Sequence, residues 1–169
     1  MDSPKLVMLN LTYKPVDFEE DRDLCFHFRE DAWLASFGNL DRYSDRDTRE
    51  WFDFLTDKCR FDARHYFMEH IWLDQKIIGQ LEYQVHPHRN GFGNQAHINL
   101  IYIGQGFRQQ GIGLQAHQYL ITRFKELGCN VVHLHYIPQN KPAEAFYIKH
   151  GWKKLGSPNK KGQMMELKI

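Results

Sequence analysis

The sequence predicts an α/β (α+β) protein that folds as one domain over residues 1–169. The 169-residue chain is long enough for one hydrophobic core and short for two domains. Hydrophobic residues make up 42% and charged residues 25%, as is usual in globular proteins. Short apolar runs typical of strands alternate with segments whose apolar residues recur at helical spacing. The order of these segments carries the fold prediction.

The first half of the chain predicts one strand, two helices and a pair of strands. Gly38 is expected to end the first helix, and Ser44 is a good N-cap for the second. Lys14-Pro15 is expected to end the first strand, and Asp74-Gln75 to connect the strand pair. The expected elements are a strand over 5–13, helices over 19–37 and 44–58, and strands over 66–73 and 76–85.

The second half predicts strand, helix, strand, helix and two final strands. Gly128 and Pro138 are expected stop signals, and Asn140 is expected to cap the last helix. A turn over 156–159, Gly-Ser-Pro-Asn, is expected to separate the final strands. The expected elements are a strand over 95–103, a helix over 111–127, a strand over 130–137, a helix over 141–150, and strands over 151–155 and 163–169.

The segment from Arg108 to Gly113 lies between an apolar strand and a helix. Gly111 and Gly113 let backbone N–H groups approach an anion, and the helix N-terminus adds a favourable dipole. Arg108 adds a charge that can pair with phosphate oxygens. No reading frame satisfies the dinucleotide fingerprint or the P-loop. The segment therefore predicts a strand–loop–helix pyrophosphate site, although a helix that merely begins with glycine would have the same sequence.

A second segment, from Asn140 to Trp152, follows the strand predicted over 130–137. Together the two segments resemble the GNAT family of acetyl-CoA-dependent N-acetyltransferases. The family's loop reads Arg/Gln-x-x-Gly-x-Gly/Ala, and here it runs from Arg108 to Gly113 after Phe107. Its second signature, Asn-x-x-Ala-x-x-x-Tyr-x-x-x-Gly-Phe, is matched in register by Asn140, Ala143, Tyr147 and Gly151, with Trp152 in place of phenylalanine. The resemblance covers roughly residues 65–169, and the order of predicted elements agrees with it.

The resemblance implies a GNAT-like fold and a bound co-substrate. The fold has a mixed, mostly antiparallel sheet of about seven strands, helices on both faces, and a splayed strand pair that forms the CoA cleft. Acetyl-CoA would lie along the strand over 95–103 and over the pyrophosphate loop. The implied CoA-binding residues are Ile101, Tyr102, Ile103, Arg108, Gln109, Gln110, Gly111, Ile112, Gly113, Asn140 and Tyr147. Asn140 is equally compatible with a simple helix cap.

Four residues are candidates for proton transfer. Tyr147 is the candidate general acid, because a phenol is protonated at neutral pH and can donate to the departing thiolate. Many family members have a glutamate where this sequence has His97, whose ordinary pKa suits base catalysis. Glu82 is the second candidate base, acting through a water molecule, and His135 is the third. Each of these residues also has an ordinary structural interpretation.

Charge is distributed unevenly along the chain, although the net charge is only +1. Residues 17–57 contain 13 acidic and five basic side chains. These acids are either solvated helix faces or an acidic approach for a cationic amine, with a basic remainder suited to CoA phosphates. The near-zero total excludes a global electrostatic argument for nucleic acid.

The predicted function is transfer of an acetyl group from acetyl-CoA to a primary amine of a small molecule or peptide. The alternative is a catalytically silent GNAT-like module that senses acyl-CoA or binds a partner. No metal is expected, because neither the three cysteines nor the ten histidines show a convincing ligand spacing. No apolar run could span a bilayer and no secretory signal is evident, so a cytoplasmic location is expected. Family precedent makes a homodimer plausible.

Overall fold

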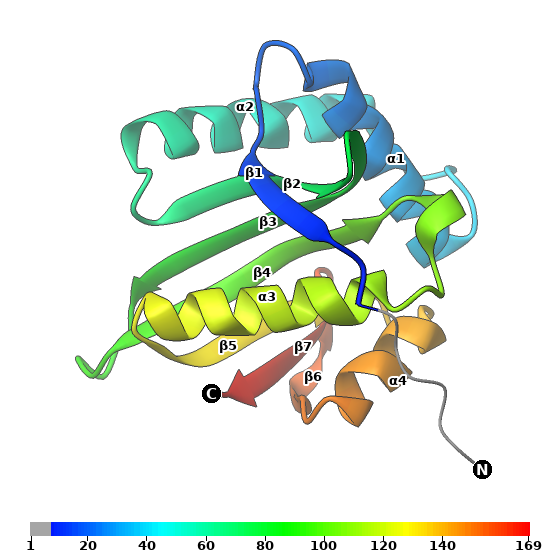
Figure 1. Ribbon diagram of the computed structural model, residues 1–169. Coiled ribbons are helices and arrows are strands. Elements are labelled where there is room, and N and C mark those ends of the chain that lie inside the picture. The colour runs from blue at the N-terminus through cyan, green and yellow to red at the C-terminus, as the bar shows by residue number, and fades with distance from the viewer. Residues whose placement is uncertain (1–7) are drawn as a thin grey trace.

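The computed structural model describes residues 8–169, which form a seven-stranded mixed sheet with helices on both faces (Figure 1). The fold class predicted from the sequence is confirmed. The elements are β1 (Leu11–Pro15), α1 (Arg22–Phe37), α2 (Asp45–Phe61), β2 (Tyr66–Leu73), β3 (Lys76–Pro87), β4 (Asn94–Ile103), the 3₁₀ turn η1 (Gln105–Phe107), α3 (Ile112–Glu126), β5 (Cys129–Tyr136), α4 (Lys141–Lys149), β6 (Lys153–Asn159) and β7 (Gly162–Lys168).

The sheet has the strand order β1-β2-β3-β4-β5-β7-β6, and β4–β5 is its parallel pair. This parallel pairing starts at Asn94 and Cys129 and ends at Ile98 and Leu134, although β4 continues to Ile103. Beyond Ile98 the side of β4 that faces β5 has no strand partner in the described chain. The opening lies at the carboxyl ends of two parallel strands, where ligands commonly bind.

A β-bulge in β4 sets which side chains face this opening. Tyr83 of β3 pairs with Ile98 and Glu82 pairs with Leu100, so Asn99 is the extra residue. A bulge reverses the alternation of side chains along a strand. Ile98 therefore packs into the core on the α3 face, whereas Leu100, two residues later, is on the opposite face together with Glu82.

Helix α3 covers one face of the sheet and lies in front of it in Figure 1. Its buried Leu120 and Phe124 belong to the main core with Leu81 and Tyr83 of β3. The other face is covered by α1 and α2, where a second cluster holds Val16, Cys25, Phe52, Leu55 and Met68. The two clusters fix the sheet between helix layers, and α1 and α2 contact β3 and β2 rather than β5. Phe28 of α1 also packs on Tyr102 of β4, with ring centroids 4.7 Å apart, so the two helices leave open mainly the β5–β7 part of this face.

Two of the sequence predictions were wrong in their bounds. The first strand covers Leu11–Pro15 rather than 5–13, of which residues 5–7 lie outside the described part of the chain. Pro15 is tolerated because β1 is an edge strand, where a missing N–H costs no central pairing. The last hairpin turns at residues 160–161 rather than 156–159, which belong to the exposed edge strand β6.

The sequence itself explains the position of that last turn. The Asn159 carboxamide accepts a hydrogen bond from the backbone N–H of Lys161 at 2.8 Å, which forms a local Asx turn. Gly162 then adopts a φ of +110°, which favours glycine. Pairing of β6 with β7 is irregular between Leu155 and Asn159, so Pro158 needs no ladder hydrogen bond. The later turn brings two lysines to the open face of the sheet.

Candidate functional site

The loop before α3 presents a run of free backbone donors. Within the described chain, the backbone N–H groups of residues 109–114 donate no hydrogen bond. Gly111 is the N-cap of α3 with a φ of +79°, and no side chain caps the helix. A side-chain carbon at Gly113 would meet no atom within 4 Å, so open space adjoins that residue. Consecutive free N–H groups at a helix N-terminus form a site for phosphate oxygens.

Arg108 links this loop to β4 and to α1 through its guanidinium group. Its Nε donates to the Ile103 carbonyl at 2.8 Å, and its terminal nitrogen pairs with the Asp31 carboxylate at 2.7 Å. The Tyr102 hydroxyl donates to the same carboxylate oxygen at 2.6 Å. Arg108 lines the cavity described next, but its charge is already paired with Asp31. Any phosphate contact of Arg108 would share the guanidinium with that carboxylate.

Two cavities meet at the opening between β4 and β5. The first, which we call the donor cavity after the role proposed for it below, has a volume of about 510 Å³ and extends to the loop before α3. It is lined by Ala32, Ala35, Ser36, Leu100, Ile101, Tyr102, Ile103, Arg108, Gln109, Gly113, Asn140, Pro142, Ala143, Phe146 and Tyr147.

The second, which we call the acceptor cavity after the role proposed for it below, has a volume of about 530 Å³. It extends toward the α1–α2 connection and the β6–β7 turn. It shares with the donor cavity the residues Ala32, Ser36, Leu100, Ile101, Asn140, Ala143 and Tyr147. The structure thus brings together most of the predicted CoA-binding residues. Gln110, Gly111 and Ile112 lie in the loop and the first turn of α3, outside the lining.

Tyr147 and Asn140 lie where the cavities join. The Tyr147 hydroxyl has no hydrogen-bond partner in the described chain, while its ring packs edge-on against Phe146 and Trp152. Burial raises the pKa of Tyr147 to about 12, so the phenol keeps its proton at neutral pH. The Asn140 carboxamide oxygen caps α4 by accepting from the Ala143 N–H at 3.2 Å. Asn140 is therefore a helix cap that also faces the site.

Glu82 is fully buried, outside the lining of either cavity. The Arg29 guanidinium pairs with both of its oxygens. The Trp51 indole N–H and the Gln80 amide each donate to one oxygen at 2.8 Å. Four donors thus occupy the roughly four lone-pair positions of this carboxylate. Glu82 anchors α1 and α2 to the sheet, and Arg29 is its link to the acceptor cavity.

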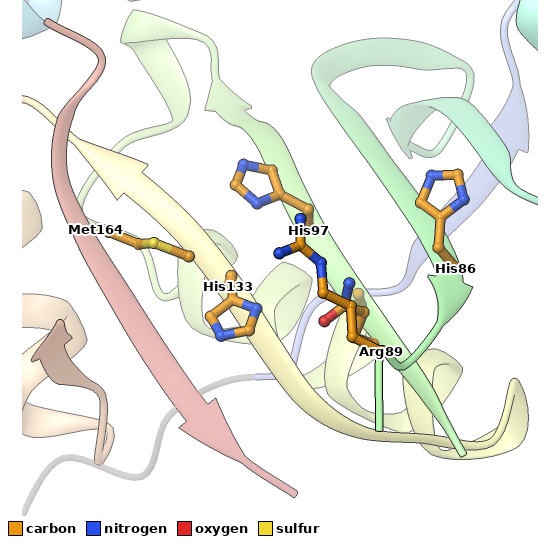
Figure 2. A pocket seen from close by; sticks show the side chains of 7 residues that line it. His86, Arg89, His97, His133 and Met164 are labelled. Atoms are coloured by element: carbon orange, nitrogen blue, oxygen red, sulfur yellow. The ribbon is translucent and has the colours of Figure 1, made fainter. Parts of the chain in front are cut away.

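His97 lies in a separate hollow beside the acceptor cavity, which we call the histidine hollow. Figure 2 shows His97 of β4 beside His133 of β5, with Arg89 reaching across from the β3–β4 loop. Burial, together with the nearby His135, His133 and Lys161, lowers the pKa of His97 to about 4. The imidazole is therefore neutral at pH 7. The histidine hollow has a volume of about 320 Å³ and is lined by His86, Arg89, Gln95, Ala96, His97, His133 and Met164.

His135 connects the histidine hollow with the acceptor cavity. It lines the acceptor cavity, and its ring centroid lies 5.5 Å from that of His97. Burial is the main cause that lowers the pKa of His135, and Lys161 and His133 contribute. The structure thus gives the third candidate base of the sequence a more direct position than His97 or Glu82.

The acidic residues between positions 17 and 57 do not surround the acceptor cavity. Of the 13, all of which lie in the described chain, Asp47 alone lines it. Others pair with basic side chains elsewhere, such as Asp31 with Arg108 and Glu50 with Arg46. The hypothesis of an acidic approach for a cationic amine therefore has no support in the lining of the site.

Several residues of the site were missed by the sequence reasoning. They come from α1, from the α1–α2 connection and from the β6–β7 turn, namely Ala32, Trp33, Ser36, Phe37, Arg42, Tyr43, Lys160 and Lys161. The family signature does not reach α1, and the misplaced turn hid the two lysines. The tandem lysines before Gly162 were the available signal, because the Asn-x-x-Gly pattern around them suits a hairpin turn.

Within residues 8–169, no group of three or more His, Cys, Asp or Glu side chains is arranged to hold a metal ion. Over the same residues, no helix has the length and apolar character needed to cross a bilayer.

Sequence comparison gives the family. A sequence profile described as "Acetyltransferase (GNAT) family" matches residues 23–152, which is most of the chain. The protein therefore belongs to the GNAT acetyltransferase family, as its loop and second signature predicted. A search of curated proteins finds no match.

Solved structures give the same fold at low sequence identity. The PaiA N-acetyltransferase of Thermoplasma acidophilum, in complex with coenzyme A, has a TM-score of 0.72 at 16% identity, covering 95% of this chain and 100% of its own. A GNAT-family acetyltransferase of Staphylococcus aureus Mu50 has a TM-score of 0.73 at 14% identity, covering 94% and 98%. The NatC complex bound to Gag peptide and CoA has a TM-score of 0.65 at 17% identity, covering 96% and 99%.

Proposed function

We propose that this protein transfers an acetyl group from acetyl-CoA directly to a primary amine. The observation that carries the proposal is the junction of two cavities at the opening between β4 and β5. One cavity ends at a run of free N–H groups suited to a diphosphate, and the other is open to a second substrate. Because the two cavities share a wall, the two substrates can react directly, without an enzyme-bound acetyl intermediate. Holding both substrates in place removes the entropic cost of a bimolecular encounter.

Acetyl-CoA would lie with its pyrophosphate on residues 109–114 and its pantetheine arm along the free side of β4. The strand N–H groups beyond Ile98 that face β5 have no strand partner, so they are available to the arm and to the thioester oxygen. Asn140 is the side-chain candidate for a contact to the arm, because it lines both cavities. The second substrate would then approach through the acceptor cavity.

Tyr147 is proposed as the general acid. The amine nitrogen attacks the thioester carbon, the carbon–sulfur bond breaks, and the phenol gives its proton to the departing thiolate. The raised pKa means that the phenol is protonated at neutral pH, and its hydroxyl has no other hydrogen-bond partner in the described chain. General acids of this kind contribute about 10²- to 10⁴-fold to rate.

The proton leaving the amine is proposed to pass to the neutral imidazoles. His135 lines the acceptor cavity and His97 lies behind it, so the proton would go first to His135. The lowered pKa of both rings means that they accept a proton weakly and release it readily. Glu82, the other candidate, is proposed to be structural, because four donors saturate its oxygens.

The test is to titrate the purified protein with acetyl-CoA by calorimetry, and then to follow thiol release from the same samples with a panel of primary amines. Binding with amine-dependent thiol release would establish the activity. Binding without release from any amine would instead favour a catalytically silent acyl-CoA-binding module. The absence of binding would contradict the assignment of residues 109–114 to a pyrophosphate.

A further inference from the structure

The acceptor cavity is positively charged, although the chain is nearly neutral. Its lining contains Arg42, Lys160 and Lys161, which form no ion pair within 4.0 Å with any described residue, and one acid, Asp47, that is likewise unpaired among the described residues. The fourth cation, Arg29, is neutralised by Glu82. Three free cations and one free anion leave a net charge of +2. Like charges repel, so this surface opposes the entry of a polycation.

These cations do not belong to the CoA site. Arg42, Lys160 and Lys161 line the acceptor cavity and are not in the lining of the donor cavity, which holds the pyrophosphate loop. They come from the α1–α2 connection and the β6–β7 turn. Lys161 also lies close enough to lower the pKa of His97 and His135, so its charge acts on the open face of the sheet. The positive charge is therefore directed at the second substrate.

Two buried donors in the same lining have no acceptor. The indole N–H of Trp33 and the side-chain amide N–H₂ of Asn99 are both shielded from solvent, and neither donates a hydrogen bond in the described chain. Asn99 is the bulge residue beside Leu100, and it lines the acceptor cavity. A buried N–H without an acceptor is costly, which favours a ligand that brings oxygen atoms.

The cavity also has an aromatic wall. Trp33 packs against Phe37 with ring centroids 4.3 Å apart and planes tilted by 30°, and Tyr43 lies edge-on to Trp33 at 5.9 Å. All three residues line the acceptor cavity together with Leu100 and Ile101. Such a wall suits a short run of methylene groups, which gain free energy when they are buried.

We propose that the acceptor is a primary amine that also carries a carboxylate, separated from the amine by an apolar spacer. The proposal rests on the proposed function, because it names the substrate class of the same site. Arg42, Lys160 and Lys161 attract the carboxylate, and a small shift of the side chains that shield them would let the Trp33 and Asn99 donors bond to its oxygens or to a neighbouring carbonyl. The Arg42 guanidinium is planar, and its fork of donors matches a carboxylate.

The test uses three series of amines that differ only in one end group: ω-amino acids of increasing chain length, the corresponding ω-amino amides, and α,ω-diamines. Each is titrated by calorimetry into protein saturated with CoA, and thiol release from acetyl-CoA is followed in parallel. The carboxylates are expected to bind about tenfold more tightly than the amides at the best chain length, and the diamines more weakly than either. Equal binding of acid and amide, or tighter binding of the diamines, would overturn the proposal.

Charge reversal locates the effect. The Lys160→Glu/Lys161→Glu double variant is expected to lose the carboxylate preference and to favour diamines. Arg89→Glu is the control for position, because it reverses a charge in the histidine hollow rather than in the acceptor cavity. Loss of the preference in Arg89→Glu, and not in the lysine variant, would refute the assigned position.

The two readouts keep the substrate class and the activity apart. Preferential binding of carboxylates without thiol release would support the ligand class inferred for the acceptor cavity and contradict the proposed function. Thiol release from diamines alone would support the proposed function and overturn the inferred substrate class.

Discussion

The ion pair between Arg29 and Glu82 gives a sharp test of which groups are structural and which are chemical. The Glu82 side chain is 1% exposed and Arg29 is 26% exposed, so the charge that cannot reach water is the carboxylate. Removing one partner of a buried pair typically costs about 3–5 kcal/mol, because the other charge is left uncompensated. Arg29→Met leaves Glu82 with only the Trp51 and Gln80 donors. We expect a loss near the lower end, about 3 kcal/mol.

Glu82→Gln should cost less than Arg29→Met. The amide keeps the shape of the carboxylate and removes its charge, but its N–H₂ group faces two donors that the carboxylate oxygen accepted. The partly exposed guanidinium of Arg29 can turn to water, which limits the cost. We expect this variant to lose about 1–2 kcal/mol. For a chain of this size each kcal/mol lowers the midpoint of thermal unfolding by about 2–4 °C. Arg29→Met should therefore melt roughly 6–12 °C lower than the wild type, which calorimetry or circular dichroism can follow.

Turnover then separates the two roles of Glu82. If the carboxylate is structural, Glu82→Gln assayed well below its melting temperature should keep turnover within about threefold of the wild type. If it is the general base, turnover should fall by about 10²-fold or more. A large loss of turnover in a variant with wild-type stability would refute the structural assignment and restore the carboxylate mechanism.

The remaining predictions concern the acid, the loop and the histidines. Tyr147→Phe should lower turnover by about 10²-fold while acetyl-CoA affinity, measured by calorimetry, stays nearly constant; unchanged turnover would remove Tyr147 from the acid role. Arg108→Ala should weaken acetyl-CoA binding by about tenfold with a smaller effect on turnover in saturated enzyme, whereas unaltered affinity would contradict a phosphate contact. Asp31→Asn should leave Arg108 less firmly braced and change acetyl-CoA affinity as well, with the exposed Glu30→Gln of the same helix as a control; equal effects of both would show that the ion pair is irrelevant. The free energy of unfolding should fall as pH decreases from about 6.5 to about 4, because burial lowers the pKa of His97 and His117 to about 4 and the unfolded chain takes up those protons first. His97→Asn should reduce that slope in urea unfolding series, and a flat profile in the wild type would contradict both shifts.

Many element boundaries of this fold follow from local capping signals that can be recognised in the sequence. Ser44 caps α2 by accepting from the Asp47 N–H at 3.1 Å, and Gly38 ends α1 with a φ of +77°. Asn140 likewise begins α4. These signals are local, because the two groups that form each cap lie within four residues of one another. Elements bounded by such signals were predicted to within a few residues.

The site was less predictable because its contacts are non-local. The β-bulge at Asn99 depends on pairing with β3, and it decides that Leu100 faces the same side as Glu82. No spacing in the sequence reveals that Arg29, 53 residues earlier, pairs with Glu82. The candidate base at His97 came from a family position, whereas its place behind His135 depends on the parallel alignment of β4 with β5.

Helix α1 connects the two halves of the proposed reaction. Arg29 fixes it to the buried Glu82 beside the acceptor cavity, and Asp31, two residues later, fixes it to Arg108 and Tyr102 at the donor cavity. Ala32 and Ser36 of the same helix line both cavities. If the pyrophosphate of acetyl-CoA contacts Arg108, it must compete with Asp31 for the guanidinium, so occupancy of the donor cavity would act on the wall of the acceptor cavity. Since the coupling between two ligands is reciprocal, an acceptor that contacts this wall changes the affinity for acetyl-CoA by the same factor.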